Sequence, residues 1–219
     1  MQAWKEKLEL VIFDMDGLLF DTERLFMDMK GRVLAEYGYE HREEDYIRTI
    51  GTAGTKLHEI LYEIYGADYP AEAISRRTRQ LVDQRIRQDG PAVKPGIAKL
   101  LETLAQAGIP CCVATSSPAA TAASYIERAG LASYFSFIIG GDAITHSKPD
   151  PEIFLKACGR AGIRPAHALV LEDSGNGILA ASAAGIPVIC IPDLEEPAPA
   201  IADKALAVVR DAGQVCSLL

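Results

Sequence analysis

The chain has 219 residues, of which 49% are hydrophobic and 24% are charged, as is typical of a soluble globular protein with a core of its own. Its formal net charge of -8 disfavours a nucleic acid or an anionic membrane as a partner, because both bind clustered lysine and arginine. The sequence shows no signal-peptide pattern, and its five cysteines form no paired framework, so we expect a cytoplasmic protein. The sequence leaves the oligomeric state open, and a monomer is the default expectation.

The first predicted element is an apolar strand over residues 8–13 that ends in paired acids. Asp14 and Asp16 follow it, separated by one residue, and Gly17 permits a sharp turn. Two carboxylates directly after a buried strand are costly to desolvate unless a cation or a proton compensates. The pair is therefore either a solvated turn or part of a cation site.

The segment from residue 18 to residue 90 shows helical patterns and no convincing strand. Apolar residues recur at helical spacing from Thr22 to about Gly38 and again over 57–64, and a polar helix is predicted over 71–88. We predict an all-helical domain of residues 18–90, inserted into a core formed by residues 1–17 and 91–219. Cationic side chains that could recognise a substrate there are Arg48, Lys56 and His58.

After this segment, strands alternate with helices to the end of the chain. The strands are predicted over 110–115, 135–139, 168–171 and 187–191, and each is apolar with little alternation, as in parallel sheets that are covered on both faces. This alternation predicts an α/β fold with a doubly wound, mostly parallel, Rossmann-like sheet.

Polar residues follow several of these strands, at the edge where ligands bind in open α/β sheets. Thr115, Ser116 and Ser117 offer hydroxyl and amide donors to an oxyanion, or cap the next helix. Lys148 precedes a predicted helix and is either a surface residue or a point charge for a phosphate. Glu172 and Asp173 form a second acidic pair, which would repel the first without a metal, and hard oxygen ligands suit Mg²⁺.

Together these groups address one chemical problem, the attack of a carboxylate on a phosphate that is also negative. A divalent cation and a lysine reduce the repulsion, and hydroxyl and amide donors hold the transferring oxygens. An acid two residues away can protonate the leaving group and later activate water.

The sequence resembles the haloacid dehalogenase-like phosphatase superfamily, in particular its β-phosphoglucomutase-like branch with a helical cap. The resemblance rests on four motifs in order, namely DMDGLLFDTE at 14–23, VATSS at 113–117, SKPDPEIF at 147–154 and LEDSGNG at 171–177. It implies a phosphatase that acts on a small phosphorylated metabolite, such as a sugar or nucleoside phosphate, through an aspartyl-phosphate.

The resemblance also implies the roles of the site residues. Asp14 is the nucleophile, Asp16 is the general acid and base, and Lys148 bridges the phosphate and the nucleophile. Thr115 and the Ser116 amide hold the phosphoryl group, and Gly17 lies at the same substrate-binding edge. Mg²⁺ is expected on Asp14, the Asp16 carbonyl and Asp173, with Glu172 beside them, and the helical cap is expected to close over the substrate.

Three other functions stay open from the sequence. A phosphomutase of the same branch is disfavoured, because Phe26 stands where the mutases carry a histidine and a glycine of the turn at 51–54 stands where they carry an arginine. A phospho-accepting signalling domain is disfavoured by the spacing of Asp14 and Asp16. A dehalogenase would leave Asp16 and Asp173 without a role.

Overall fold

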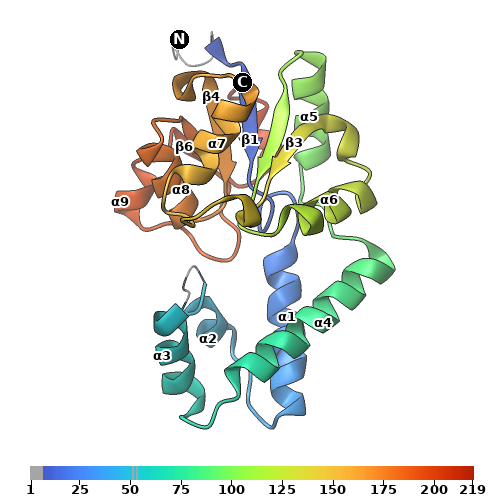
Figure 1. Cartoon of the computed structure of the whole chain (residues 1–219), viewed down its shortest axis with the longest axis vertical. Coiled ribbons are helices and arrows are strands. Elements are labelled where there is room, and N and C mark those ends of the chain that lie inside the picture. Colours follow the sequence, from blue (N-terminus) through green and yellow to red (C-terminus); the bar gives the residue numbers. More distant parts are fainter. Residues whose placement is uncertain (1–6, 51, 53) are drawn as a thin grey trace. The chain divides into compact units, whose positions relative to one another are not determined.

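A computed structural model describes residues 7–50, 52 and 54–219 and divides the chain into two compact units (Figure 1). One unit consists of residues 1–21 and 91–219, and the other of residues 22–90. The predicted insert began at residue 18, whereas residues 18–20 are buried and Phe20 packs edge-on against Tyr125 of the larger unit. The expectations for the start of the chain and for the turn at 51–54 fall partly on residues 1–6, 51 and 53, which lie outside the described residues.

The larger unit contains a six-stranded parallel sheet in the order β3-β2-β1-β4-β5-β6. This sheet confirms the predicted α/β, Rossmann-like fold class. The strands are β1 (Leu10–Phe13), β2 (Cys111–Ala114), β3 (Phe135–Ile139), β4 (Ala168–Glu172), β5 (Val188–Cys190) and β6 (Ala207–Val208). The five predicted strands correspond to β1–β5, whereas β6 has two residues and was not predicted.

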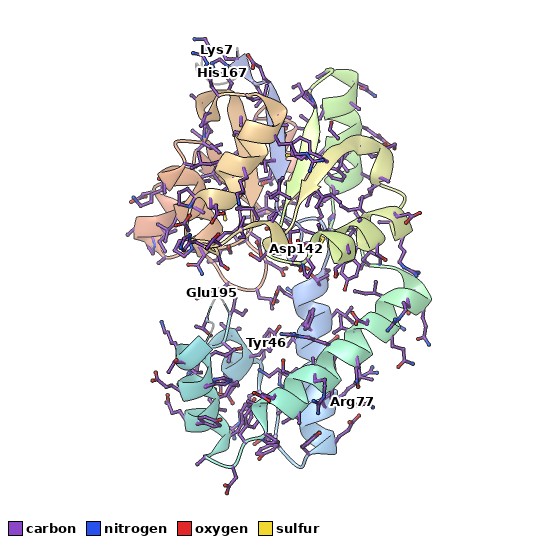
Figure 2. All side chains as sticks on the ribbon, in the orientation of Figure 1. Lys7, Tyr46, Arg77, Asp142, His167 and Glu195 are labelled. Atoms are coloured by element: carbon purple, nitrogen blue, oxygen red, sulfur yellow. The ribbon has the colours of Figure 1, made fainter. Side chains whose placement is uncertain are left out.

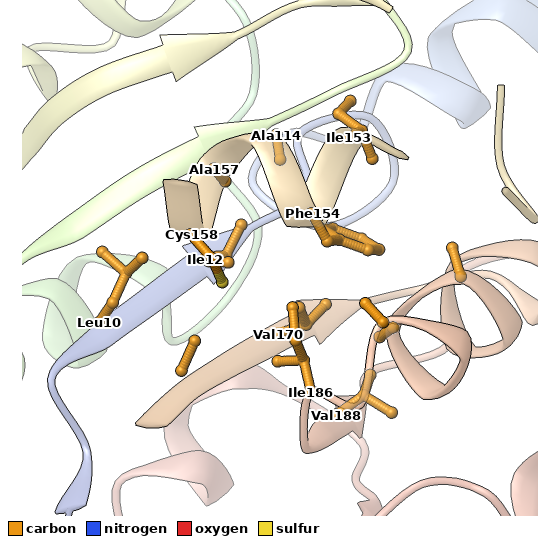
Figure 3. Close-up of a cluster of buried hydrophobic side chains, with 14 of the residues drawn as sticks. Leu10, Ile12, Ala114, Ile153, Phe154, Ala157, Cys158, Val170, Ile186 and Val188 are labelled. Carbon is orange, nitrogen blue, oxygen red and sulfur yellow. The ribbon is translucent and has the colours of Figure 1, made fainter. Parts of the chain in front are cut away.

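Helices α7 (Glu152–Ala161) and α8 (Gly175–Ala183) pack against the sheet. Figure 3 shows the apolar face of α7, with Phe154 and Cys158, on the side of Ile12 of β1 and Val170 of β4. The central strands β1 and β4 are buried along their whole length, which explains their unbroken apolar sequences. The other α-helices of this unit are α5 (Ile97–Gln106), α6 (Ala119–Arg128), α9 (Pro199–Ala202) and α10 (Ala212–Val215).

The smaller unit is helical and has a core of its own. Its helices are α1 (Thr22–Glu36), α2 (Glu43–Ile47), α3 (Gly54–Tyr65) and α4 (Ala71–Asp89). Helix α1 packs against α4, and Val33, Leu61 and Ile74 belong to one buried apolar cluster. Helix α2 was not predicted, because five residues with three acids at the start carry no apolar repeat.

Two antiparallel segments of the larger unit lie next to the ends of the helical insert. The Asp21 amide donates to the Ala92 carbonyl at 2.9 Å, and the Lys94 amide donates to the Leu19 carbonyl at 2.9 Å. Phe20 and Val93 form an antiparallel bridge between these two segments.

None of the helices described combines the length and apolar character that crossing a membrane requires.

Candidate active site

The predicted site residues lie at the carboxyl edge of the sheet. Asp14 follows β1, Thr115 follows β2 and Asp173 follows β4, and β1 lies between the other two strands in the sheet. The strand order reverses at β1, which is where open α/β sheets bind ligands. In Figure 2, Asp142 and Glu195 mark this edge, whereas Lys7 and His167 mark the opposite one.

Lys148 connects the first acidic pair to the second. Its ammonium donates to Asp14 Oδ1, to Glu172 Oε1 at 2.6 Å and to the Ala114 carbonyl at 3.4 Å. The ammonium also lies 5.0 Å from the centre of the Phe154 ring. The side chains of Lys148 and Glu172 are 7% and 1% exposed, so water screens this interaction poorly.

Glu172 is held from both sides. Its Oε2 atom accepts hydrogen bonds from the Asp173 amide at 3.0 Å, the Ser174 amide at 2.9 Å and the Ser174 hydroxyl at 3.0 Å. The Ser174 hydroxyl also caps α8, because it accepts from the Gly177 amide at 3.0 Å. The carboxylate of Glu172 is therefore fixed between Lys148 and the start of α8.

Asp16 lies among hydroxyl donors. Its Oδ2 atom accepts from the Ser117 hydroxyl at 2.8 Å and from the Thr115 hydroxyl at 3.4 Å. Thr115 is fully buried and its hydroxyl accepts from the Ser117 amide at 3.0 Å, whereas Ser116 is exposed. Ser117 was expected only as a donor to an oxyanion or as part of a helix cap, and its contact with Asp16 was not predicted.

The site carries more negative than positive charge. Burial, reinforced by nearby Glu172 and Asp16, raises the pKa of Asp14 to about 7, although Lys148 opposes this shift. Burial, together with Glu172 and Asp14, raises the pKa of Asp173 well above its usual range. Burial would also raise the pKa of Glu172, but the Lys148 ammonium and the Ser174 donors outweigh burial and lower it.

Three of these carboxylates could share a metal ion. One oxygen from each of Asp14, Glu172 and Asp173 lies within 4.8 Å of the others. A hard divalent cation suits such oxygen donors, and its charge would offset the repulsion that raises the pKa values of Asp14 and Asp173. The donor set therefore fits Mg²⁺.

The helical unit contains a cavity of about 400 Å³ that is lined mainly by α1, α3, α4 and the segment around α2. Lys30 lines it, with its ammonium 5.3 Å from the centre of the Tyr46 ring. Burial lowers the pKa of Lys30, and among the described residues no carboxylate lies within 4.0 Å of its ammonium. Arg48, considered from the sequence, instead pairs with Glu63 at 2.9 Å on the surface.

Comparison with known proteins identifies a family that matches most of the chain. The haloacid dehalogenase-like hydrolase family matches residues 11–191, which include every predicted site residue. The chain belongs to this family. The sequence-based prediction of the family is thus confirmed, and the hydrolase is an enzyme of the predicted phosphatase class.

The relatives of this haloacid dehalogenase-like hydrolase include several named phosphatases. It is 34% identical over 179 residues to the phosphorylated carbohydrates phosphatase of Thermotoga maritima, with 82% of each chain covered. It is 33% identical over 213 residues to the probable pseudouridine-5'-phosphatase of Drosophila melanogaster, with 94% of this chain and 91% of that one covered.

A solved structure has a similar fold over nearly the whole hydrolase chain. CbbY from Rhodobacter sphaeroides, in complex with phosphate, superposes with a TM-score of 0.76 at 28% identity. The match covers 95% of this chain and 96% of CbbY, so both the sheet and the helical insert have counterparts there.

Proposed function

We propose that this protein hydrolyses the phosphomonoester of a small phosphorylated metabolite, a sugar or nucleoside phosphate, through an aspartyl-phosphate on Asp14. The observation that carries the proposal is the buried contact of Asp14 with Lys148 at the strand-order reversal, surrounded by further acids. The phosphatase names of the relatives support the reaction class, and two of these names supply the sugar and nucleoside phosphate classes.

In the first step, an oxygen of Asp14 bonds to phosphorus and the bond from phosphorus to the ester oxygen breaks. Asp16, protonated at this stage, gives its proton to the departing oxygen. The hydroxyls of Ser117 and Thr115 hold the carboxyl group of Asp16 in place for this transfer. In the second step, Asp16 takes a proton from water, the water oxygen bonds to phosphorus, and Asp14 is released with inorganic phosphate.

The remaining groups bind and orient the phosphoryl group. Lys148 contacts Asp14 and is placed to neutralise charge as phosphate approaches, and Thr115 with the Ser116 amide would hold the phosphoryl oxygens. Mg²⁺, bound by Asp14, the Asp16 carbonyl and Asp173 with Glu172 beside them, would withdraw negative charge from the phosphate. Gly17 leaves the edge beside Asp173 free of a side chain.

We further propose that the helical unit acts as a cap and that its cavity takes part in selecting the substrate. Lys30 is a half-buried cation that lines this cavity together with the hydroxyl-bearing residues Tyr46 and Thr49. Such a set suits a hydroxylated group that carries a second negative charge. The predicted monomeric state and cytoplasmic location stay predictions.

The proposal is tested by measuring phosphate release from a panel of phosphorylated metabolites, with Mg²⁺ and with EDTA. We expect activity only with Mg²⁺, and we expect Asp14→Asn to lower it by at least about 1,000-fold while the unfolding curve stays close to that of wild type. A variant that keeps normal hydrolysis would remove Asp14 from the mechanism.

A second measurement tests the covalent intermediate. During turnover the protein is treated with borohydride, which reduces an acyl phosphate, and the peptide that contains Asp14 is analysed by mass spectrometry. We expect the reduced residue at position 14 and none at Asp16. Isomerised sugar phosphate from a hexose 1-phosphate, in place of free phosphate, would instead identify a phosphomutase.

The cavity is tested with the same panel. Lys30→Met should lower kcat/KM by about 10- to 100-fold for substrates with a second anionic group, since a hydrogen bond to a charged group is lost. Substrates with a neutral organic part should be affected little. Arg32→Met, at an exposed position of the same helix α1, is the matched control. An equal loss for both substrate groups would contradict a role in selection.

A further inference from the structure

A fifth carboxylate lies at the same edge of the sheet. Asp193 follows β5, and its side chain is only 3% exposed. Its Oδ1 atom accepts a hydrogen bond from the ammonium of Lys94, whose side chain is 16% exposed. Its Oδ2 atom is buried and accepts no hydrogen bond from any residue that the structure describes.

The position of Gly17 shows where this oxygen points. A Cβ atom added to Gly17 would lie 2.2 Å from Asp173 Oδ2 and 3.3 Å from Asp193 Oδ2. Both oxygens therefore face the space beside the Gly17 turn, which Gly17 leaves open and where its positive φ of 78° also favours glycine. Asp193 thus shares this space with a carboxylate assigned to the metal.

A buried carboxylate oxygen without a donor is costly, and a second carboxylate beside it adds repulsion. The cost disappears if a hydrogen-bond donor occupies the space between them. Mg²⁺ retains several of its water ligands in protein sites, and those waters donate hydrogen bonds to nearby acceptors. Lys94 does not fill this role in the structure, because its ammonium contacts Oδ1 of Asp193 and leaves Oδ2 without a hydrogen bond.

We propose that Asp193 is a positioning residue of the magnesium site, whose Oδ2 atom accepts a hydrogen bond from a water ligand of Mg²⁺ while Lys94 fixes the carboxylate. The inference rests on the proposed function, because it requires the metal. It adds Asp193 and Lys94 to the residues that determine the affinity for the metal. Lys94 lies in the segment that hydrogen-bonds with Leu19, so the Gly17 turn and this pair belong to one packed region.

The test measures Mg²⁺ affinity by calorimetry on the full-length, metal-free protein without substrate. Asp193→Asn keeps the shape of the side chain and removes its charge, and we expect the Kd for Mg²⁺ to rise by about 10-fold or more. Glu195→Gln removes the same charge from an exposed position of the same loop (Figure 2) and should leave the Kd unchanged.

Urea unfolding in EDTA separates this role from a structural one. If Asp193 only anchors Lys94, Asp193→Asn will lower the free energy of unfolding and leave the Kd for Mg²⁺ unchanged, which would overturn the inference. The double variant Lys94→Met with Asp193→Asn removes both charges, avoids an unpaired buried ion and keeps the test open if the single variant does not fold. It should show the same loss of Mg²⁺ affinity.

The two proposals fail in different ways. If wild-type protein binds no Mg²⁺, the metal of the proposed function is wrong and this inference falls with it. If wild type binds Mg²⁺ and Asp193→Asn binds it equally well, only the role of Asp193 is wrong.

Discussion

At the scale of single residues, Lys148 is the cation on which the buried acids depend. It contacts both Asp14 and Glu172, and all three side chains are at most 8% exposed. Burial opposes the charge of Lys148, but Asp14 and Glu172 outweigh it and raise the pKa of the ammonium. The lysine is therefore charged in the folded protein and holds the two acids together.

We expect Lys148→Met to lower the free energy of unfolding of the metal-free protein by about 3–5 kcal/mol, because removing one member of a buried ion pair leaves the other uncompensated. Urea unfolding in EDTA at neutral pH measures the change. The loss should be smaller at about pH 5, because Asp14, whose pKa is raised to about 7, is then protonated and needs no cation.

Lys99→Met is the control for this variant, since Lys99 is an exposed residue of α5. Its free energy of unfolding should change little at either pH. Equal stability of Lys148→Met and wild type at neutral pH would show that the acids do not rely on this ammonium.

At the scale of secondary-structure elements, α8 positions the site by packing its first turn against Glu172. A Cβ atom on Gly177 would lie 1.8 Å from Glu172 Cδ and 2.0 Å from its Oε1 atom. The helix can therefore approach the carboxylate only with glycine at this position, although glycine is a poor helix former.

Gly177→Ala sets two effects against each other. Alanine favours the helix by about 1 kcal/mol, whereas overpacking a closed site costs about 1–3 kcal/mol and moves the carboxylate that holds Lys148. We expect net destabilisation and a strong loss of phosphatase activity. Gly159→Ala in α7 is the control, because nothing lies within 4 Å of the new Cβ atom, and its free energy of unfolding should rise by about 0.5–1 kcal/mol. A Gly177→Ala variant that is both stabilised and active would refute the packing argument.

The secondary-structure elements also show which features could be predicted from the sequence. Strands β1, β2, β4 and β5 are buried and apolar, and β3 is largely apolar though only partly buried, so their pattern was clear. The acids and hydroxyls that follow β1, β2 and β4 could be placed at one edge. The pair of Lys94 and Asp193 was not predicted, since 99 residues separate its members and neither lies in a distinctive motif. Lys30 was also missed, because the sequence of a helix of mixed polarity does not reveal which lysine lines a cavity.

At the scale of the whole molecule, two units fold around separate cores, and the chain enters and leaves the helical unit at neighbouring points. The segments 19–21 and 92–94 of the larger unit hydrogen-bond with each other. Asp14 and Asp16 lie a few residues before the first of these segments in sequence, and Lys94, which contacts Asp193, lies within the second. Metal binding is thus expected to stabilise the region where the chain passes between its two units.

The raised pKa of Asp173 predicts how its replacement changes the free energy of unfolding without and with Mg²⁺. Asp173 has a raised pKa because burial, Glu172 and Asp14 all oppose its charge, so its ionised form costs stability without a cation. In EDTA at neutral pH, Asp173→Asn should therefore be more stable than wild type. With Mg²⁺ at about 100 times its Kd, wild type should gain about 2.7 kcal/mol, whereas the variant should gain much less.

Unfolding in urea at a series of Mg²⁺ concentrations measures both effects, and the order of the two stabilities should reverse as Mg²⁺ is added. Asp203→Asn, at an exposed position after α9, controls for the loss of one negative charge and should follow wild type throughout. If Asp173→Asn gains as much stability from Mg²⁺ as wild type does, Asp173 is not a ligand. If instead the variant is less stable than wild type in EDTA, the repulsion inferred among the acids is not what limits the stability of the metal-free protein.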